Sequence, residues 1–104
     1  MKGEMKMIRH IVMWRLAPCE DKKEKAMLIK ENLEALKNKI DVLVDIEVGI
    51  NFEGSDSASD VVLVSTFKTA EDLNAYQNHP AHKAVGTAFV RPNVAERRVC
   101  DYEF

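Results

Sequence analysis

The chain has 104 residues, of which 46% are hydrophobic and 31% are charged, and its formal net charge at pH 7 is -2. This composition excludes a disordered or collagen-like chain and predicts one globular domain with a small core, for which oligomerisation is a common route to stability. The near-neutral charge argues against nucleic acid as a partner, because phosphate recognition needs a basic surface.

No segment predicts a membrane span or a secretion signal, since no apolar run approaches the roughly 20 residues that cross a bilayer. We therefore expect no membrane partner and a cytoplasmic location. The two cysteines, Cys19 and Cys100, belong to no metal-binding spacing, so both are predicted to be free thiols. Residues 1–6 lack apolar periodicity and are predicted to be a disordered tail, so that the domain spans residues 7–104.

Residues 7–16 predict a β-strand with two largely apolar faces. One face carries the side chains of His10, Val12 and Trp14 and is expected to lie against helices. The other face is mostly apolar and rimmed by arginines, and its apolar members are Met7, Ile11 and Met13. A monomer would leave this second face in water, and an exposed apolar patch of that kind marks an interface.

Residues 21–39 predict an amphipathic helix with Asp21 as its N-cap and Glu24 in the capping-box position. Its core stripe recurs at three- and four-residue steps and consists of Ala26, Ile29, Leu33, Leu36 and Ile40. Residues 42–50 alternate between apolar and polar side chains, as in a half-buried strand, and a polar loop follows. Residues 60–67 are apolar on both faces and predict a buried, central strand.

Residues 69–78 predict a second helix, with Thr69 as its N-cap and Tyr76 on its inward face. Pro80 disfavours helical geometry at His79, so the chain is expected to turn there and to begin a short helix with Pro80 at its first position. His79 is interpreted as structural, because the residue before a proline is conformationally restricted and serves the turn.

A last strand at residues 94–102 completes the order strand, helix, strand, strand, helix, strand. This order is the split βαβ arrangement of a ferredoxin-like α+β domain, with a four-stranded antiparallel sheet and two helices on one face. No internal repeat and no low-complexity linker divides the chain into two domains.

The corner between the last two predicted helices concentrates chemistry in one segment, Tyr76-Gln77-Asn78-His79-Pro80-Ala81-His82. His82 is expected in the first turn of the short helix, whose partial positive charge favours a neutral imidazole. A neutral imidazole is the state that a general base needs. The alternative is that the segment is only a rigid corner, with Tyr76 packed beneath it and both imidazoles half exposed.

Five segments together carry a family resemblance. They are Arg9-His10-Ile11-Val12, Val48-Gly49-Ile50-Asn51, Phe67-Lys68-Thr69, the tyrosine-to-histidine corner, and Asp101-Tyr102. On these segments the chain resembles the stress-responsive dimeric α/β barrel (Dabb) family over residues 7–104. The resemblance implies a homodimer whose two sheets pack into an eight-stranded barrel with the helices outside, which would cover the second apolar face of the first strand.

The same family includes a plant polyketide cyclase, in which a tyrosine and a histidine of this motif act on a bound polyketide. By that likeness Tyr76 polarises a carbonyl oxygen, His82 removes a proton from the neighbouring carbon, and His10 matches a pocket histidine. The cyclase has a further histidine at the start of its third strand, where this chain has Asp60 and Val61. Polyketide cyclisation is therefore not implied.

We expect His82, Tyr76 and His10 to converge on a cavity for a small apolar or carbonyl-containing ligand, with acid–base chemistry of a cyclase or isomerase type. The predicted apolar walls are Trp14, Val12, Leu73 and Phe89. The alternative is a non-catalytic, stress-responsive dimer whose value lies in oligomer stability. Three histidines invite a metal, but no carboxylate or cysteine spacing supports one and no haem or flavin motif occurs, so no cofactor is predicted.

Overall fold

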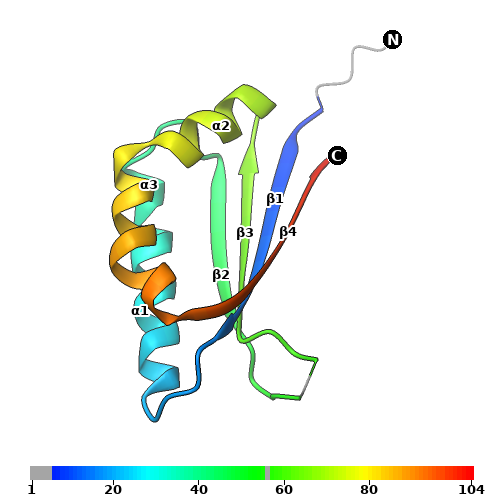
Figure 1. The fold of residues 1–104 in the computed structure, drawn as a ribbon. Helices are drawn as coiled ribbons and strands as arrows, with labels where there is room; N and C mark the ends of the chain where they lie inside the picture. The colour runs from blue at the N-terminus through cyan, green and yellow to red at the C-terminus, as the bar shows by residue number, and fades with distance from the viewer. Residues whose placement is uncertain (1–5, 56) are drawn as a thin grey trace.

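The computed structural model describes residues 6–55 and 57–104 (Figure 1). Its strands and α-helices are β1 (Ile8–Leu16), α1 (Lys22–Glu34), β2 (Asp45–Ile50), β3 (Val61–Phe67), α2 (Ala70–Asn78), α3 (Pro80–Val85) and β4 (Val94–Glu103). A 3₁₀ turn, Ala35–Asn38, extends α1, and a π-helical turn, Gly86–Val90, and a 3₁₀ turn, Arg91–Asn93, join α3 to β4. The tail predicted at residues 1–6 lies outside the described residues except for Lys6, which is exposed.

The four strands form one antiparallel sheet in the order β2-β3-β1-β4. The helices cover one face of this sheet and leave the other face bare (Figure 1). These observations confirm the predicted ferredoxin-like α+β class and the central place of β3. None of the helices in the described part of the chain is long and apolar enough to cross a membrane.

Strand β1 shows the predicted alternation of its two faces. His10, Val12 and Trp14 are buried beneath the helices, whereas Met13 on the opposite face is 42% exposed. Because cross-strand partners share a face, the outer face continues onto β4 through the pair Ile11 and Cys100. The outer face of the sheet, which we define as the surface that carries Ile11, Met13 and Cys100, is therefore uncovered in the single chain.

All five residues of the predicted stripe are buried. The α-helix ends at Glu34 rather than near residue 39, so the last two stripe residues lie beyond it, Leu36 in the 3₁₀ turn and Ile40 just after that turn. Asp21 is the N-cap residue as predicted, but its side chain makes no capping hydrogen bond, so the capping-box prediction was wrong. A different contact ties the helix to the sheet, because Lys30 Nζ donates to the carbonyl of Val48 at 2.6 Å.

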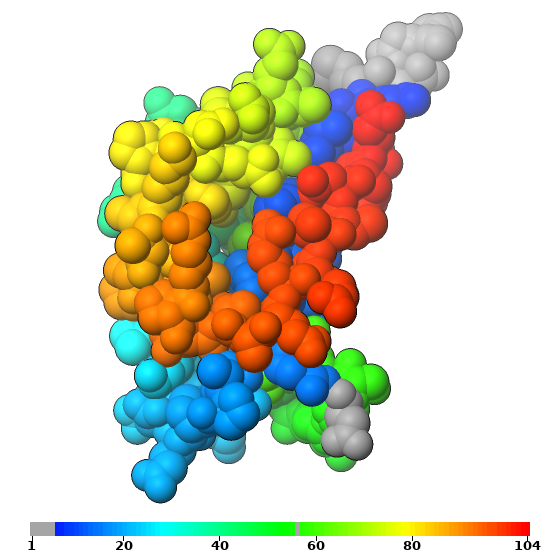
Figure 2. All heavy atoms as spheres, in the orientation of Figure 1, coloured from blue at the N-terminus to red at the C-terminus, as the bar shows by residue number. Residues whose placement is uncertain are grey.

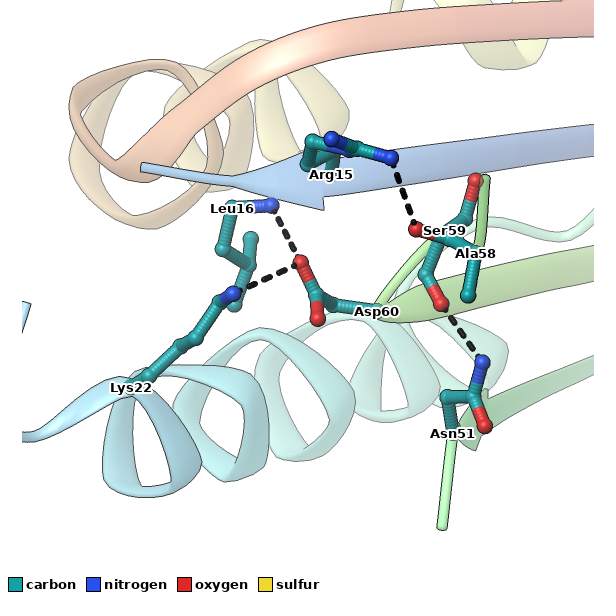
Figure 3. A network of polar contacts seen from close by, with 7 residues as sticks. All are labelled: Arg15, Leu16, Lys22, Asn51, Ala58, Ser59 and Asp60. Atoms are coloured by element: carbon teal, nitrogen blue, oxygen red, sulfur yellow. Dashed lines mark hydrogen bonds and ion pairs between the residues drawn. The ribbon is translucent and has the colours of Figure 1, made fainter. Parts of the chain in front are cut away.

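The end of β1 is fixed by Asp60 (Figure 3). The Asp60 carboxylate accepts the backbone N–H of Leu16 at 2.8 Å and lies 3.3 Å from Lys22 Nζ. Strand β3 therefore begins one residue later than predicted, at Val61, whose side chain is buried in the core. This network explains the aspartate at the position where the resemblance implied a histidine, because its carboxylate joins the loop to β1.

The corner after α2 forms as predicted. Thr69 caps α2 by accepting the N–H of Asp72 at 3.0 Å, and α3 begins at Pro80. His79 serves as the N-cap of α3, with its ring Nδ1 accepting the N–H of Ala81 at 3.0 Å. This contact gives His79 the structural role that the sequence predicted.

Candidate functional site

A cavity of about 460 Å³ lies between the sheet and the segment that runs from α3 to β4. Its walls are largely apolar and include Val12, Trp14, Leu33, Leu63, Val90 and Val94. Figure 2 shows a hollow in the same place, between the segment from α3 to the π-helical turn and β4, with β1 in blue at its floor. A concave, mostly apolar cavity of this size is typical of sites for small molecules.

His10 lies on the helix-facing side of β1 and in the wall of this cavity. Its Nδ1 donates a hydrogen bond to the carboxylate of Asp101, the residue directly opposite on β4. The imidazole of His10 is buried, whereas the Asp101 side chain is 42% exposed. A carboxylate on one ring nitrogen fixes the orientation of the imidazole and leaves Nε2 as the nitrogen that exchanges protons.

His82 faces the same cavity from α3. Burial lowers the pKa of His82 below its ordinary value of 6.5, and the positive charges of His10, Arg97 and Arg91 act in the same direction, while the backbone carbonyl of Gln77 opposes them. The predicted neutral state is therefore supported, but its main cause is burial rather than the helix terminus. The buried Nδ1 of His82 has no hydrogen-bond partner among the residues that the structure describes.

Tyr76 lies behind His82 and is fully buried. Its ring centroid is 4.5 Å from that of His82 and 6.4 Å from that of His10. Burial raises the pKa of the Tyr76 hydroxyl, so the phenol stays protonated near neutral pH. The hydroxyl oxygen is buried without a hydrogen-bond partner within residues 6–55 and 57–104. Two unpaired polar atoms thus lie on adjacent rings, which is uncommon in folded proteins.

The predicted residues do not all meet at the cavity. His10, His82, Val12 and Trp14 line it, and Tyr76 packs against His82 from behind. Leu73 and Phe89, which we predicted as walls, are not among the lining residues. Leu73 is buried in the core, and Phe89 packs against that core. The wall from this segment is instead formed at four-residue steps by His82, Gly86 and Val90, and Phe89 falls beside that row.

Sequence reasoning missed seven of the residues that line the cavity, namely Leu33, Leu63, Gly86, Val90, Arg91, Val94 and Arg97. Arg91 and Arg97 line the cavity, and Gly86 leaves open space where a side chain would otherwise project. The 3₁₀ turn that carries Arg91 is held by Asn93, whose side chain donates to the carbonyl of Phe89 at 2.7 Å and accepts from Lys25 at 3.1 Å. Asp101 was recognised in a motif but was given no role. The places of Arg97 and Asp101 depend on the pairing of β4 with β1, for which the local sequence carries no signal.

The described residues hold no group of three or more His, Cys, Asp or Glu side chains that is arranged to bind a metal ion. At the cavity, His10 contacts the carboxylate of Asp101. The two imidazoles of the cavity, those of His10 and His82, can exchange protons and form hydrogen bonds.

A family model described as "Stress responsive A/B Barrel Domain" matches residues 8–104. The chain belongs to the Dabb family. This membership agrees with the sheet order and with the position of the histidine corner over the sheet, and it confirms the resemblance that the sequence carries.

Three of the proteins to which the chain is similar are uncharacterised or of unknown function. An uncharacterised protein of Streptomyces coelicolor is 34% identical over 99 residues, which cover 94% of this chain and 100% of that relative. A dimeric ferredoxin-like protein of unknown function from Bacteroides fragilis has a TM-score of 0.84 and 36% identity, covering 94% of this chain and 96% of its own. A dimeric ferredoxin-like protein of unknown function from Thermobifida fusca has a TM-score of 0.78 and 25% identity, and the match covers 95% of this chain and 92% of that protein's chain.

Proposed function

We propose that this Dabb protein binds a small, largely apolar carbonyl compound in its cavity and catalyses proton transfer at the carbon next to the carbonyl. The observation that carries the proposal is the convergence of one buried imidazole, His10, and one half-buried imidazole, His82, on one apolar cavity of about 460 Å³. An apolar cavity with a few converging titratable groups is the usual arrangement of a small-molecule site.

His82 is the base in this proposal. Its lowered pKa keeps the imidazole neutral near pH 7, and His82 lines the cavity. His82 removes a proton from the carbon, and the electron pair of the broken C–H bond moves to the carbonyl oxygen to give an enol. His10 enters this step as the imidazolium, with a proton on each ring nitrogen, and donates the Nε2 proton to that oxygen while Asp101 holds the ring in place through Nδ1. Reversal of the two transfers returns the ketone.

Tyr76 is a positioning residue in the same proposal. Its ring packs on His82 and limits how that imidazole can rotate, and its protonated hydroxyl is a hydrogen-bond donor. The direct role for Tyr76 as the group that polarises the carbonyl stays a prediction, because Tyr76 is not among the residues that line the cavity.

The test is exchange of the α-protons of phenylacetone in D₂O, followed by NMR, since this small ketone is apolar and uncharged. We expect the protein to accelerate exchange over buffer and His82→Ala to lose roughly 100-fold or more of that rate, the usual contribution of a general base. Lys83→Ala changes the adjacent, exposed residue and is the matched control. Exchange no faster than in buffer, or undiminished in His82→Ala, would leave the non-catalytic dimer as the better account.

Gly86 allows a second test that does not touch the titratable groups. A Cβ added at Gly86 meets no heavy atom within 4 Å, and the backbone there is helical, so Gly86→Leu should fold normally. The new side chain should fill part of the cavity and block both ketone exchange and ligand binding. Ala84→Leu adds the same side chain on the exposed face of α3 and should keep both activities.

We also infer that the chain forms a homodimer through the outer face of the sheet. Support comes from the exposure of Met13 at 42% and from the dimeric proteins of known structure to which the chain is similar. Burial of this face would remove apolar surface from water and add to the small core of one chain. The cavity lies on the opposite, helix-covered face of the sheet, so dimer formation and ligand binding do not compete for one surface.

A further inference from the structure

The cavity carries two cationic groups that proton transfer on a ketone does not use. Arg91 lies in the turn before β4, and Arg97 lies on β4 directly opposite Trp14, hence on the helix-facing side of the sheet. Neither guanidinium makes a salt bridge with an acidic residue in the described ranges of the chain. Arginine beside an apolar surface is well suited to bind a carboxylate through two parallel hydrogen bonds.

The acidic side chains near the cavity do not neutralise these arginines. No aspartate or glutamate is among the described residues that line it. Asp101 is engaged by His10. The cavity therefore combines an apolar body with a positive mouth.

We propose that the natural ligand is an apolar molecule that ends in a carboxylate, with its chain against Val12 and Trp14 and its carboxylate between Arg91 and Arg97. This inference rests on the proposed ligand-binding function and adds the chemical class of the ligand. A ligand of this class would enter with its apolar part first, because both arginines are exposed at the surface and the apolar walls lie deeper. The carboxylate then stays at the mouth, and the opposite end reaches the histidines.

Binding can be measured through Trp14, which is the only tryptophan of the chain and lines the cavity. The probes are octanoate and its neutral isostere octanamide, titrated at pH 7.5 and followed by tryptophan fluorescence. We expect octanoate to bind roughly tenfold or more tightly than octanamide, as is usual for a hydrogen bond that involves charged groups. Raising the salt concentration should weaken octanoate binding and leave octanamide binding unchanged.

Arg97→Gln should abolish the preference for octanoate and leave octanamide binding intact. Lys83→Gln is the matched control, because it removes the same charge from the exposed side of α3 and should keep the preference. Equal affinities for the two probes, an equal loss in Lys83→Gln, or no binding of either probe to the wild-type protein would overturn the proposal. Phenylacetone carries no carboxylate, so its exchange can succeed while the octanoate test fails, and the two proposals can be judged separately.

Discussion

The substitution Tyr76→Phe separates a binding site from a structural corner, because it removes one oxygen atom and keeps the ring. Tyr76 is 0% exposed, and its hydroxyl has no hydrogen-bond partner in the part of the chain that the structure describes. A buried, unpaired hydroxyl costs about 1–3 kcal/mol of stability relative to its state in water. We therefore expect Tyr76→Phe to leave the free energy of unfolding unchanged or to raise it by about 1 kcal/mol.

The packing around the ring supports this sign. Phenylalanine keeps the contacts with Phe67, at a centroid distance of 5.1 Å, and with His82, at 4.5 Å. The aromatic area that Tyr76 buries against its neighbours is therefore retained, and only the desolvation of the hydroxyl changes. A gain of 1 kcal/mol would raise the melting temperature by about 4 °C or slightly more for a domain of this size.

The assay is urea unfolding of both proteins at one fixed protein concentration, since the stability of a dimer depends on concentration. Tyr102→Phe is the matched control, because Tyr102 is 42% exposed and the same change there should have little effect. A loss of more than about 1 kcal/mol in Tyr76→Phe would refute the reasoning, since it would mean that the hydroxyl makes a net favourable hydrogen bond in the folded protein.

Three further predictions concern the histidines and the outer face. The pKa of His82 is lower in the folded chain than its ordinary value of 6.5, so the unfolded chain binds more protons as the pH falls below 6.5. The free energy of unfolding should therefore decrease below pH 6.5, and the decrease should be smaller in His82→Gln. Urea unfolding across this pH range measures both. Asp101→Asn should slow ketone exchange at least tenfold with roughly 1 kcal/mol or less of destabilisation, because the amide no longer fixes the tautomer of His10 and the lost carboxylate is partly solvated. In the dimer, alkylation should modify the exposed Cys19 quickly and Cys100, which lies on the outer face of the sheet, slowly. Light scattering confirms that the sample is a dimer. Equal alkylation rates of the two thiols in that dimer would mean that the interface is not the outer face.

Features set by local chemistry could be predicted from the sequence. The two-residue alternation of β1 placed His10 on the helix side, and the stripe of α1 identified the core face of that helix. Pro80 fixed the start of α3, and Thr69 fixed the start of α2. Each of these follows from backbone geometry within a few residues, which a single sequence displays directly.

Features set by long-range pairing could not be predicted. The contact of His10 with Asp101 depends on the register of β1 with β4, and the two residues are 91 positions apart. Phe89 was predicted in the cavity wall, whereas Gly86 and Val90 of the π-helical turn line the cavity and Phe89 packs against the core. No role was predicted for Arg97, since nothing in the sequence shows which face of β4 lies over a cavity.

The two accounts of this protein, ligand binder and structural dimer, differ in what they require of the corner around Tyr76. A protein selected for stability alone gains nothing from burying polar atoms without partners, because each one lowers the free energy of unfolding. The Tyr76 hydroxyl and the His82 Nδ1 are two such atoms on adjacent rings, and His82 faces the cavity. Local sacrifices of stability concentrate at functional sites. The corner therefore favours a binding site, and the sign of the stability change in Tyr76→Phe measures how much stability that site gives up.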